Sequence, residues 1–122
     1  MLMLYLKYQQ INDMKKYIST WNKIEQLTFL LDDDGDNLSG FHLVEKIIKE
    51  QIKPEIIRYD YSWEASKLYF TKDNIELELE YSGWIGIALR VSVLYTEEQL
   101  NVCEKWARLL YDEIKKMKQG KQ

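Results

Sequence analysis

The sequence predicts an α+β fold, in which a mostly antiparallel sheet of four or five strands has helices packed on one face. Two observations support this class. Residues 75–94 alternate apolar and polar side chains around a glycine-containing turn, as a β-hairpin does. Residues 96–118 repeat apolar side chains every three or four positions, as an amphipathic helix does. With 122 residues, 46% of them hydrophobic, the chain has the size of one domain, so we expect a single domain over residues 1–122.

The hairpin of residues 75–94 separates two faces. Its first arm places four apolar residues on one face, Ile75, Leu77, Leu79 and Tyr81, and three acids on the other, Glu76, Glu78 and Glu80. A three-residue turn, Ser82-Gly83-Trp84, keeps the faces of the two arms consistent. This register pairs Leu79 with Ile87 and places Glu76 opposite Arg90, in a cross-strand ion pair.

The N-terminal third holds one ambiguous segment, one short helix and one strand. Residues 1–10 fit a strand and a helix equally well, because their apolar side chains satisfy both spacings. Asn12 and Asp13 predict the cap of a short helix that ends at Trp21. That helix would carry Met14, Tyr17, Ile18 and Trp21. Residues 24–31 predict a strand with Leu27, Phe29 and Leu31 facing inward.

A second helix follows the acidic loop of residues 32–40. Ser39 is its predicted N-cap, Leu38 and Leu43 can form a hydrophobic staple, and Pro54 marks its end. The side chains that we expect it to bury are Leu43, Val44, Ile47, Ile48 and Ile52.

The rest of the chain predicts two more strands and the C-terminal helix. Residues 56–61 and 67–71 alternate, and a turn near Lys72-Asp73 joins the second of them to the hairpin, with Lys67 opposite Glu78. Thr96 and Gln99 form a capping box that begins the last helix. Its apolar stripe consists of Leu100, Cys103, Ala107, Leu110, Ile114 and Met117.

Composition narrows the classes of function. A net charge of −3 and a pI near 5.2 argue against a nucleic-acid partner. No stretch approaches the ~20 apolar residues of a membrane span, and the first residues lack the pattern of a secretion signal. The single cysteine, Cys103, fits a reducing compartment, so we expect a cytoplasmic protein. We also expect a buried, inert thiol there.

We expect neither a metal nor a cofactor. The run Asp32-Asp33-Asp34-Gly35-Asp36 resembles a calcium loop, but the positions that an EF-hand fills with oxygen ligands hold Leu30 and Phe41. The chain has a single histidine, His42, so a site with two histidines cannot form. The glutamates of the hairpin point off an open sheet face, which favours a solvated or partner-binding surface over acid–base catalysis.

Residues 39–68, about a quarter of the chain, carry a family resemblance. Gly40-Phe41, the helix to Ile52, the strand Ile57-Arg-Tyr-Asp60 and the pair Glu64-Ala65 resemble part of the immunity proteins of bacterial polymorphic-toxin systems. The resemblance implies a cytoplasmic protein that binds and neutralises one cognate toxin domain, without catalysis of its own. The alternative is a small regulatory or adaptor domain that binds a host protein or peptide. An enzyme is a third hypothesis, which we do not expect.

Two acidic surfaces are the predicted binding sites for the partner. The loop contributes Asp32, Asp33, Asp34 and Asp36, with no Lys or Arg nearby in the sequence, so we expect it to dominate electrostatic steering. The sheet face contributes Tyr69, Glu76, Glu78 and Glu80, with Trp84 beside it. Trp63 and Trp84 both fall in or beside loops, where aromatic side chains often anchor interfaces.

Overall fold

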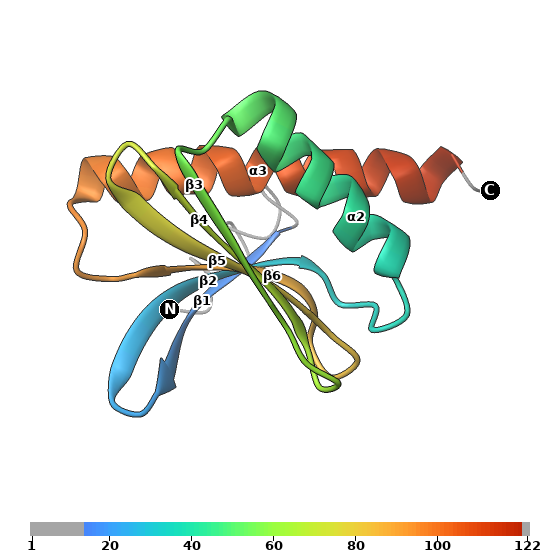
Figure 1. Ribbon diagram of the computed structural model, residues 1–122, viewed down its shortest axis with the longest axis horizontal. Helices are drawn as coiled ribbons and strands as arrows, with labels where there is room; N and C mark the ends of the chain where they lie inside the picture. The colour runs from blue at the N-terminus through green and yellow to red at the C-terminus, as the bar shows by residue number, and fades with distance from the viewer. Residues whose placement is uncertain (1–13, 121–122) are drawn as a thin grey trace, which may run out of the picture.

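The computed structural model describes residues 14–120, which form one antiparallel six-stranded sheet with two helices on one face (Figure 1). The strands are β1 (Lys15–Trp21), β2 (Ile24–Asp32), β3 (Ile56–Tyr61), β4 (Ser66–Lys72), β5 (Ile75–Ser82) and β6 (Gly86–Ser92). Their spatial order is β1-β2-β6-β5-β4-β3. The α+β class is confirmed, although the sheet has six strands instead of four or five. The question of strand or helix for residues 1–10 lies outside the described residues.

The additional strand is β1, where the predicted short helix is wrong. Residues Lys15–Trp21 pair with β2 through a two-residue turn, Asn22-Lys23, whose φ angles are 50° and 66°. Two successive positive φ angles give a hairpin turn that matches the twist of the strands. The β-branched and aromatic side chains from Tyr17 to Trp21 also favour a strand. Their helical spacing misleads because Tyr17, Ile18 and Trp21 are all exposed.

The hairpins have the predicted faces, but both are shifted by two residues. Asp73 and Asn74, with φ angles of 53° and 64°, form the turn between β4 and β5, so Lys67 lies opposite Glu80 and not Glu78. Aspartate and asparagine tolerate this left-handed conformation, and the sequence-based register placed the turn one residue too early. In the next hairpin Ser82 remains paired with Gly86, so Arg90 lies opposite Glu78 and not Glu76. A shift of two preserves the face of every side chain.

The helices pack their apolar sides on the sheet. Helix α2 (Leu38–Ile47) begins two residues earlier than predicted, because Asn37 is the N-cap and its Oδ1 accepts a hydrogen bond from the Gly40 N–H at 2.9 Å. A π-helical turn (Ile48–Ile52) extends it up to Lys53. Helix α3 (Glu97–Gly120) begins with the predicted capping box, in which the Gln99 N–H donates to Thr96 Oγ1 at 3.1 Å.

The core lies between the sheet and the two helices. Its largest fully buried side chains include Phe29, Phe41, Phe70, Ile48, Leu68, Leu77, Leu79 and Leu89. Cys103, Ala107, Leu110 and Ile114 are buried on α3, as their spacing predicts. Neither α2 nor α3 has the length and apolarity needed to cross a membrane.

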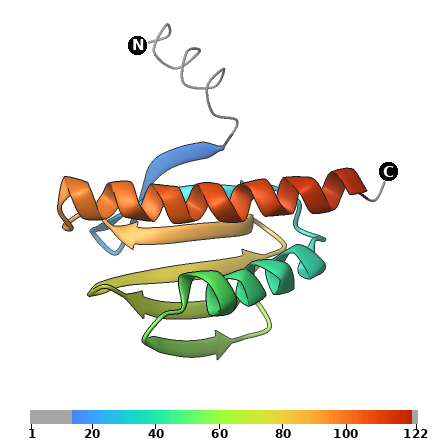
Figure 2. The ribbon, with the colours of Figure 1, turned by 90° about the horizontal axis from the view of Figure 1, so that it is seen from above.

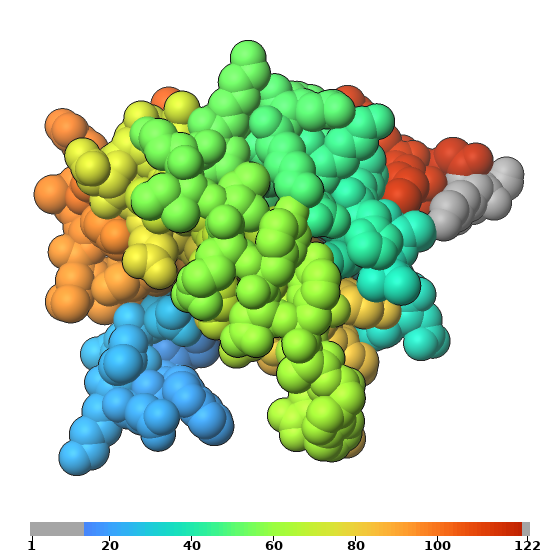
Figure 3. Space-filling model, viewed as in Figure 1, coloured from blue at the N-terminus to red at the C-terminus, as the bar shows by residue number. Residues whose placement is uncertain are grey.

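No helix of residues 14–120 lies on the other face of the sheet, which we call the uncovered face. Figure 3 shows the β1–β2 turn and the β3–β4 turn projecting from the body of the molecule, with an open space between them. Arg90, which points onto the uncovered face, is only 8% exposed.

Candidate functional site

Three connections meet at one end of the sheet: the loop of residues 33–37, the β3–β4 turn of residues 62–65 and the β5–β6 turn of residues 83–85. The strand order explains this. β2 ends where β6 begins, with Asp32 opposite Ile87, and β5 ends where β4 begins, with Tyr81 opposite Ser66. Neighbouring antiparallel strands therefore bring three distant segments of the chain together.

The acidic loop is fixed against the β5–β6 turn. The Tyr81 hydroxyl donates a hydrogen bond to the Gly35 carbonyl at 2.7 Å. A Cβ atom at position 35 would lie 2.4 Å from the Gly83 carbonyl oxygen, so only glycine allows this approach. Gly86 has a φ of 93°, and a Cβ there would lie 2.1 Å from the Asp32 carbonyl oxygen. The loop is therefore held in place by close backbone contact.

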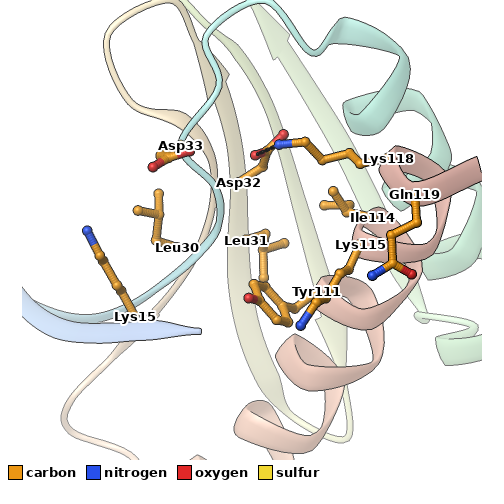
Figure 4. Close-up of a pocket in the computed structure, with 10 residues that line it drawn as sticks. All are labelled: Lys15, Leu30, Leu31, Asp32, Asp33, Tyr111, Ile114, Lys115, Lys118 and Gln119. Carbon is orange, nitrogen blue, oxygen red and sulfur yellow. Dashed lines mark hydrogen bonds and ion pairs between the residues drawn. The ribbon is translucent and has the colours of Figure 1, made fainter. Parts of the chain in front are cut away.

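Asp32 has a structural role within this loop. Its side chain is only 4% exposed and accepts a hydrogen bond from Lys118 Nζ at 2.7 Å (Figure 4). It also accepts a hydrogen bond from Asn37 Nδ2 at 2.6 Å. The hydrogen bond with Asp32 raises the pKa of Lys118. The sequence shows no cation that offsets the loop, but α3 supplies one from 86 residues away. Asp33, Asp34 and Asp36 remain exposed.

A cavity of about 330 Å³ lies between this part of β2 and the end of α3 (Figure 4). Three lysines line it, Lys15, Lys115 and Lys118, together with Asp32 and Asp33. Figure 4 shows Lys118 reaching to Asp32 while Lys115 points away from it. The lysines do not converge on one point, so the cavity does not present a convergent site for an anion.

The strongest candidate site is a hollow of about 500 Å³ between the β3–β4 and β5–β6 turns. Trp63 and Trp84 line it and are 93% and 92% exposed. The charged residues of its lining are Asp60, Glu64, Lys67 and Glu80. Aromatic rings next to an excess of carboxylates suit a Lys or Arg side chain, which the ring face and the acids both attract. We call this hollow, with the exposed acids Asp33, Asp34 and Asp36 beside it, the tryptophan end.

The uncovered sheet face is largely neutralised. Arg90 forms ion pairs with Glu78, at 3.2 Å, and with Glu80. Both glutamate side chains are at most 15% exposed, so this group contributes one net negative charge in a partly buried setting. Tyr69 is half-buried, with the Arg58 guanidinium 4.2 Å from its ring. Burial and the neighbouring Glu78 carboxylate raise the pKa of Tyr69.

The structure therefore divides the predicted binding residues. Trp84 and Glu80 line the hollow, and three loop acids lie beside it, whereas Glu76 lies at the other end of β5, where its N–H donates to the Tyr95 hydroxyl at 2.9 Å. Trp63, Asp60 and Glu64 were not among the predicted binding residues. The position of Trp63 in a loop could have indicated a binding role. That Trp63 and Trp84 line the same hollow, however, follows from the strand order.

The histidine, the cysteine and possible metal ligands were also candidates for a functional site. Within residues 14–120, no three His, Cys, Asp or Glu side chains are grouped so that they could hold a metal ion. His42 lies on the exposed side of α2, with Nδ1 3.3 Å from a Glu45 oxygen. Burial raises the pKa of the Cys103 thiol to about 12. Comparison with protein-family models, curated proteins and solved structures gives no match to this chain.

Proposed function

We propose that this protein is an immunity protein, which binds a cognate toxin domain in the cytoplasm and neutralises it by occlusion, without catalysis of its own. The tryptophan end supports this proposal more than any other feature. Two tryptophans exposed by more than nine-tenths, among carboxylates at one end of the sheet, have the chemistry of an interface anchor. The resemblance of residues 39–68 to immunity proteins points in the same direction.

Charge suggests the kind of surface that docks. Asp33, Asp34 and Asp36 are exposed, and the hollow adds Asp60 and Glu64 against Lys67, while Arg90 pairs with its Glu80. Many toxins, nucleases especially, present basic active sites. An acidic end would attract such a surface over a distance of about one Debye length, ~8–10 Å at moderate salt. The charges thus support fast capture of a basic partner.

The hollow suggests how inhibition works. A Lys or Arg side chain of the toxin would enter the hollow beside Trp63 and Trp84, where the docked toxin would bury the rings and the carboxylates would pair with the cation. A basic residue that serves the active site of the toxin would then be unable to reach its substrate. No bond is made or broken in this mechanism.

A co-expression experiment tests the function. The variable C-terminal domain of a toxin-like reading frame adjacent to the gene for this chain is expressed alone and together with the chain. We expect growth arrest when the toxin domain is expressed alone, normal growth on co-expression, and a stable one-to-one complex on purification.

The matched control is the double variant Trp63→Ala and Trp84→Ala, checked for unchanged thermal unfolding. We expect it to fold and to protect cells poorly. If the wild-type chain neither binds the adjacent domain nor restores growth, the proposed function is wrong. If the double variant protects fully, the function stands but the tryptophan end is not its site.

A further inference from the structure

Strand β3 forms an edge of the sheet that nothing in the described chain covers. It pairs with β4 on one side only, and within residues 14–120 no strand pairs with its other side. Figure 2 shows β3 at the outer margin of the sheet, beyond α2. Proteins commonly protect such edges with lysine, proline or a bulge. The other edge, β1, begins with Lys15 and Lys16, whereas Ile56–Tyr61 contains neither lysine nor proline.

The hairpin turn determines which backbone groups of β3 face outward. The Ser62 N–H donates to the Ala65 carbonyl at 2.9 Å and closes the hairpin with β4. Hydrogen bonding alternates along an antiparallel pair. Asp60 and Arg58 therefore direct their N–H and C=O groups toward β4. Tyr61, Tyr59 and Ile57 direct theirs outward, where a further strand could accept and donate hydrogen bonds.

The sequence of β3 is complementary to itself in one antiparallel register. With Tyr59 of one copy opposite Tyr59 of a second copy, Ile57 lies opposite Tyr61 in hydrogen-bonded pairs. Arg58 then lies opposite Asp60 in pairs without hydrogen bonds, where Cα atoms are only about 4.5 Å apart and side chains are closest. A register shifted by two toward either end would place Arg58 opposite Arg58 or Asp60 opposite Asp60, like charges that repel.

We propose that two copies of this chain associate through β3 in this register and form one continuous sheet. The joint would also cover apolar side chains, since Ile56, Tyr59 and Tyr61 are 61%, 40% and 56% exposed in one copy. Trp63 and Trp84 lie outside the paired residues, so each copy keeps both tryptophans exposed. Asp60 is shared, because it lines the hollow and would also pair with Arg58 of the second copy. The dimer does not rest on the proposed function, and sedimentation tests it without the toxin.

Sedimentation velocity over a series of protein concentrations tests the dimer. We expect the mass to rise from 14.7 kDa toward twice that value as concentration increases. Arg58→Asp or Asp60→Arg alone places like charges opposite each other and should weaken association on the order of tenfold or more. The double variant restores opposite charges and should dimerise as the wild type does. Lys105→Asp, an exposed change on α3, is the control of matched charge and should have no effect.

Sedimentation of a mixture of the two single variants is the decisive experiment. Arg58→Asp and Asp60→Arg chains should each associate weakly alone and pair with each other as tightly as the wild type, because every charge then meets its opposite. Amide hydrogen exchange at Ile57, Tyr59 and Tyr61 should slow as the wild type dimerises. A wild type that is monomeric at every concentration overturns the proposal. Dimers that persist undiminished in both single variants, or single variants that fail to pair on mixing, also overturn it.

Discussion

Among the four aspartates of residues 32–36, Asp32 is the one whose carboxylate stabilises the fold. It is almost fully buried, and Lys118 and Asn37 satisfy its oxygens. Removing the cation leaves a buried charge with only neutral partners, the Asn37 amide and the Asp34 N–H, which costs more than the pair contributes. Lys118 is 45% exposed, and solvent therefore reduces the effect. We expect Lys118→Met to lower the free energy of unfolding by about 1–2 kcal/mol in urea denaturation.

Lys116→Met is the matched control for this variant. Lys116 is 72% exposed and pairs with Glu113 one turn away on the same helix. Its removal should change the free energy of unfolding by less than about 0.5 kcal/mol. Equal effects of the two variants would show that the contact with Asp32 contributes nothing specific.

Cys103 should make stability depend on pH above its ordinary pKa. Burial raises the thiol pKa from 9.0 to about 12, so the folded state keeps the proton while the unfolded chain loses it. A raised pKa gives stability that is fully present below pH 9 and is lost as pH rises toward 12. Between pH 8 and 10 the wild type should lose about 1.4 kcal/mol relative to Cys103→Ala. Urea denaturation at the two pH values measures this difference, and a constant difference would contradict a thiol held neutral.

At the scale of elements, the β1–β2 turn offers a test of local strain. Lys23 has a φ of 66°, a conformation that costs a residue with a Cβ atom about 1 kcal/mol and glycine almost nothing. Lys23→Gly also creates Asn-Gly, the preferred pair for this turn. We expect a gain of about 0.5–1 kcal/mol in the free energy of unfolding. Lys72→Gly, within β4, should instead destabilise the protein, and a similar sign for both would reject the explanation.

The elements also show what sequence alone can predict here. The alternating pattern from Ile75 gives the correct faces of β5, and the capping box at Thr96 gives the start of α3, because both signals are local. Both registers fail by two residues, because alternation does not locate the turns. The φ angles of Asp73 and Asn74 determine the β4–β5 turn, and the pairing of Ser82 with Gly86 determines the β5–β6 turn. The prediction of a short helix before Trp21 is wrong in type as well as in detail. The apolar residues there have helical spacing, but pairing with β2 determines their conformation.

At the scale of the whole molecule, the candidate site required the strand order. The sequence singles out the acids of residues 32–36 and Trp84 separately, and no local pattern places Trp63 beside Trp84. Nor does it show that Lys118 pairs with Asp32 or that Arg90 pairs with both Glu78 and Glu80. Each of these contacts joins segments far apart in the sequence. As a result, the exposed negative charge lies mainly at the tryptophan end and not on the sheet face.

This redistribution of charge predicts separate kinetic roles for the acids and the tryptophans of that end. Asp33, Asp34 and Asp36 are exposed and near the hollow, so they act on approach. Reversing all three to lysine should slow association with the adjacent toxin domain by about tenfold at low salt and flatten its salt dependence. Trp63→Ala or Trp84→Ala should act mainly on dissociation, since both rings would be buried in the complex.

Stopped-flow association and surface-based dissociation, each at low and moderate salt, separate these effects. The control of equal charge change reverses Glu50, Glu76 and Asp112, which are exposed and outside the lining of the hollow. It should affect association far less, because screening limits charges more than about 10 Å from the docking surface. If the two triple variants slow association equally, only net charge matters and the loop has no special role. If the control alone does so, docking takes place near Glu76 or on the helices, and the tryptophan end is the wrong surface.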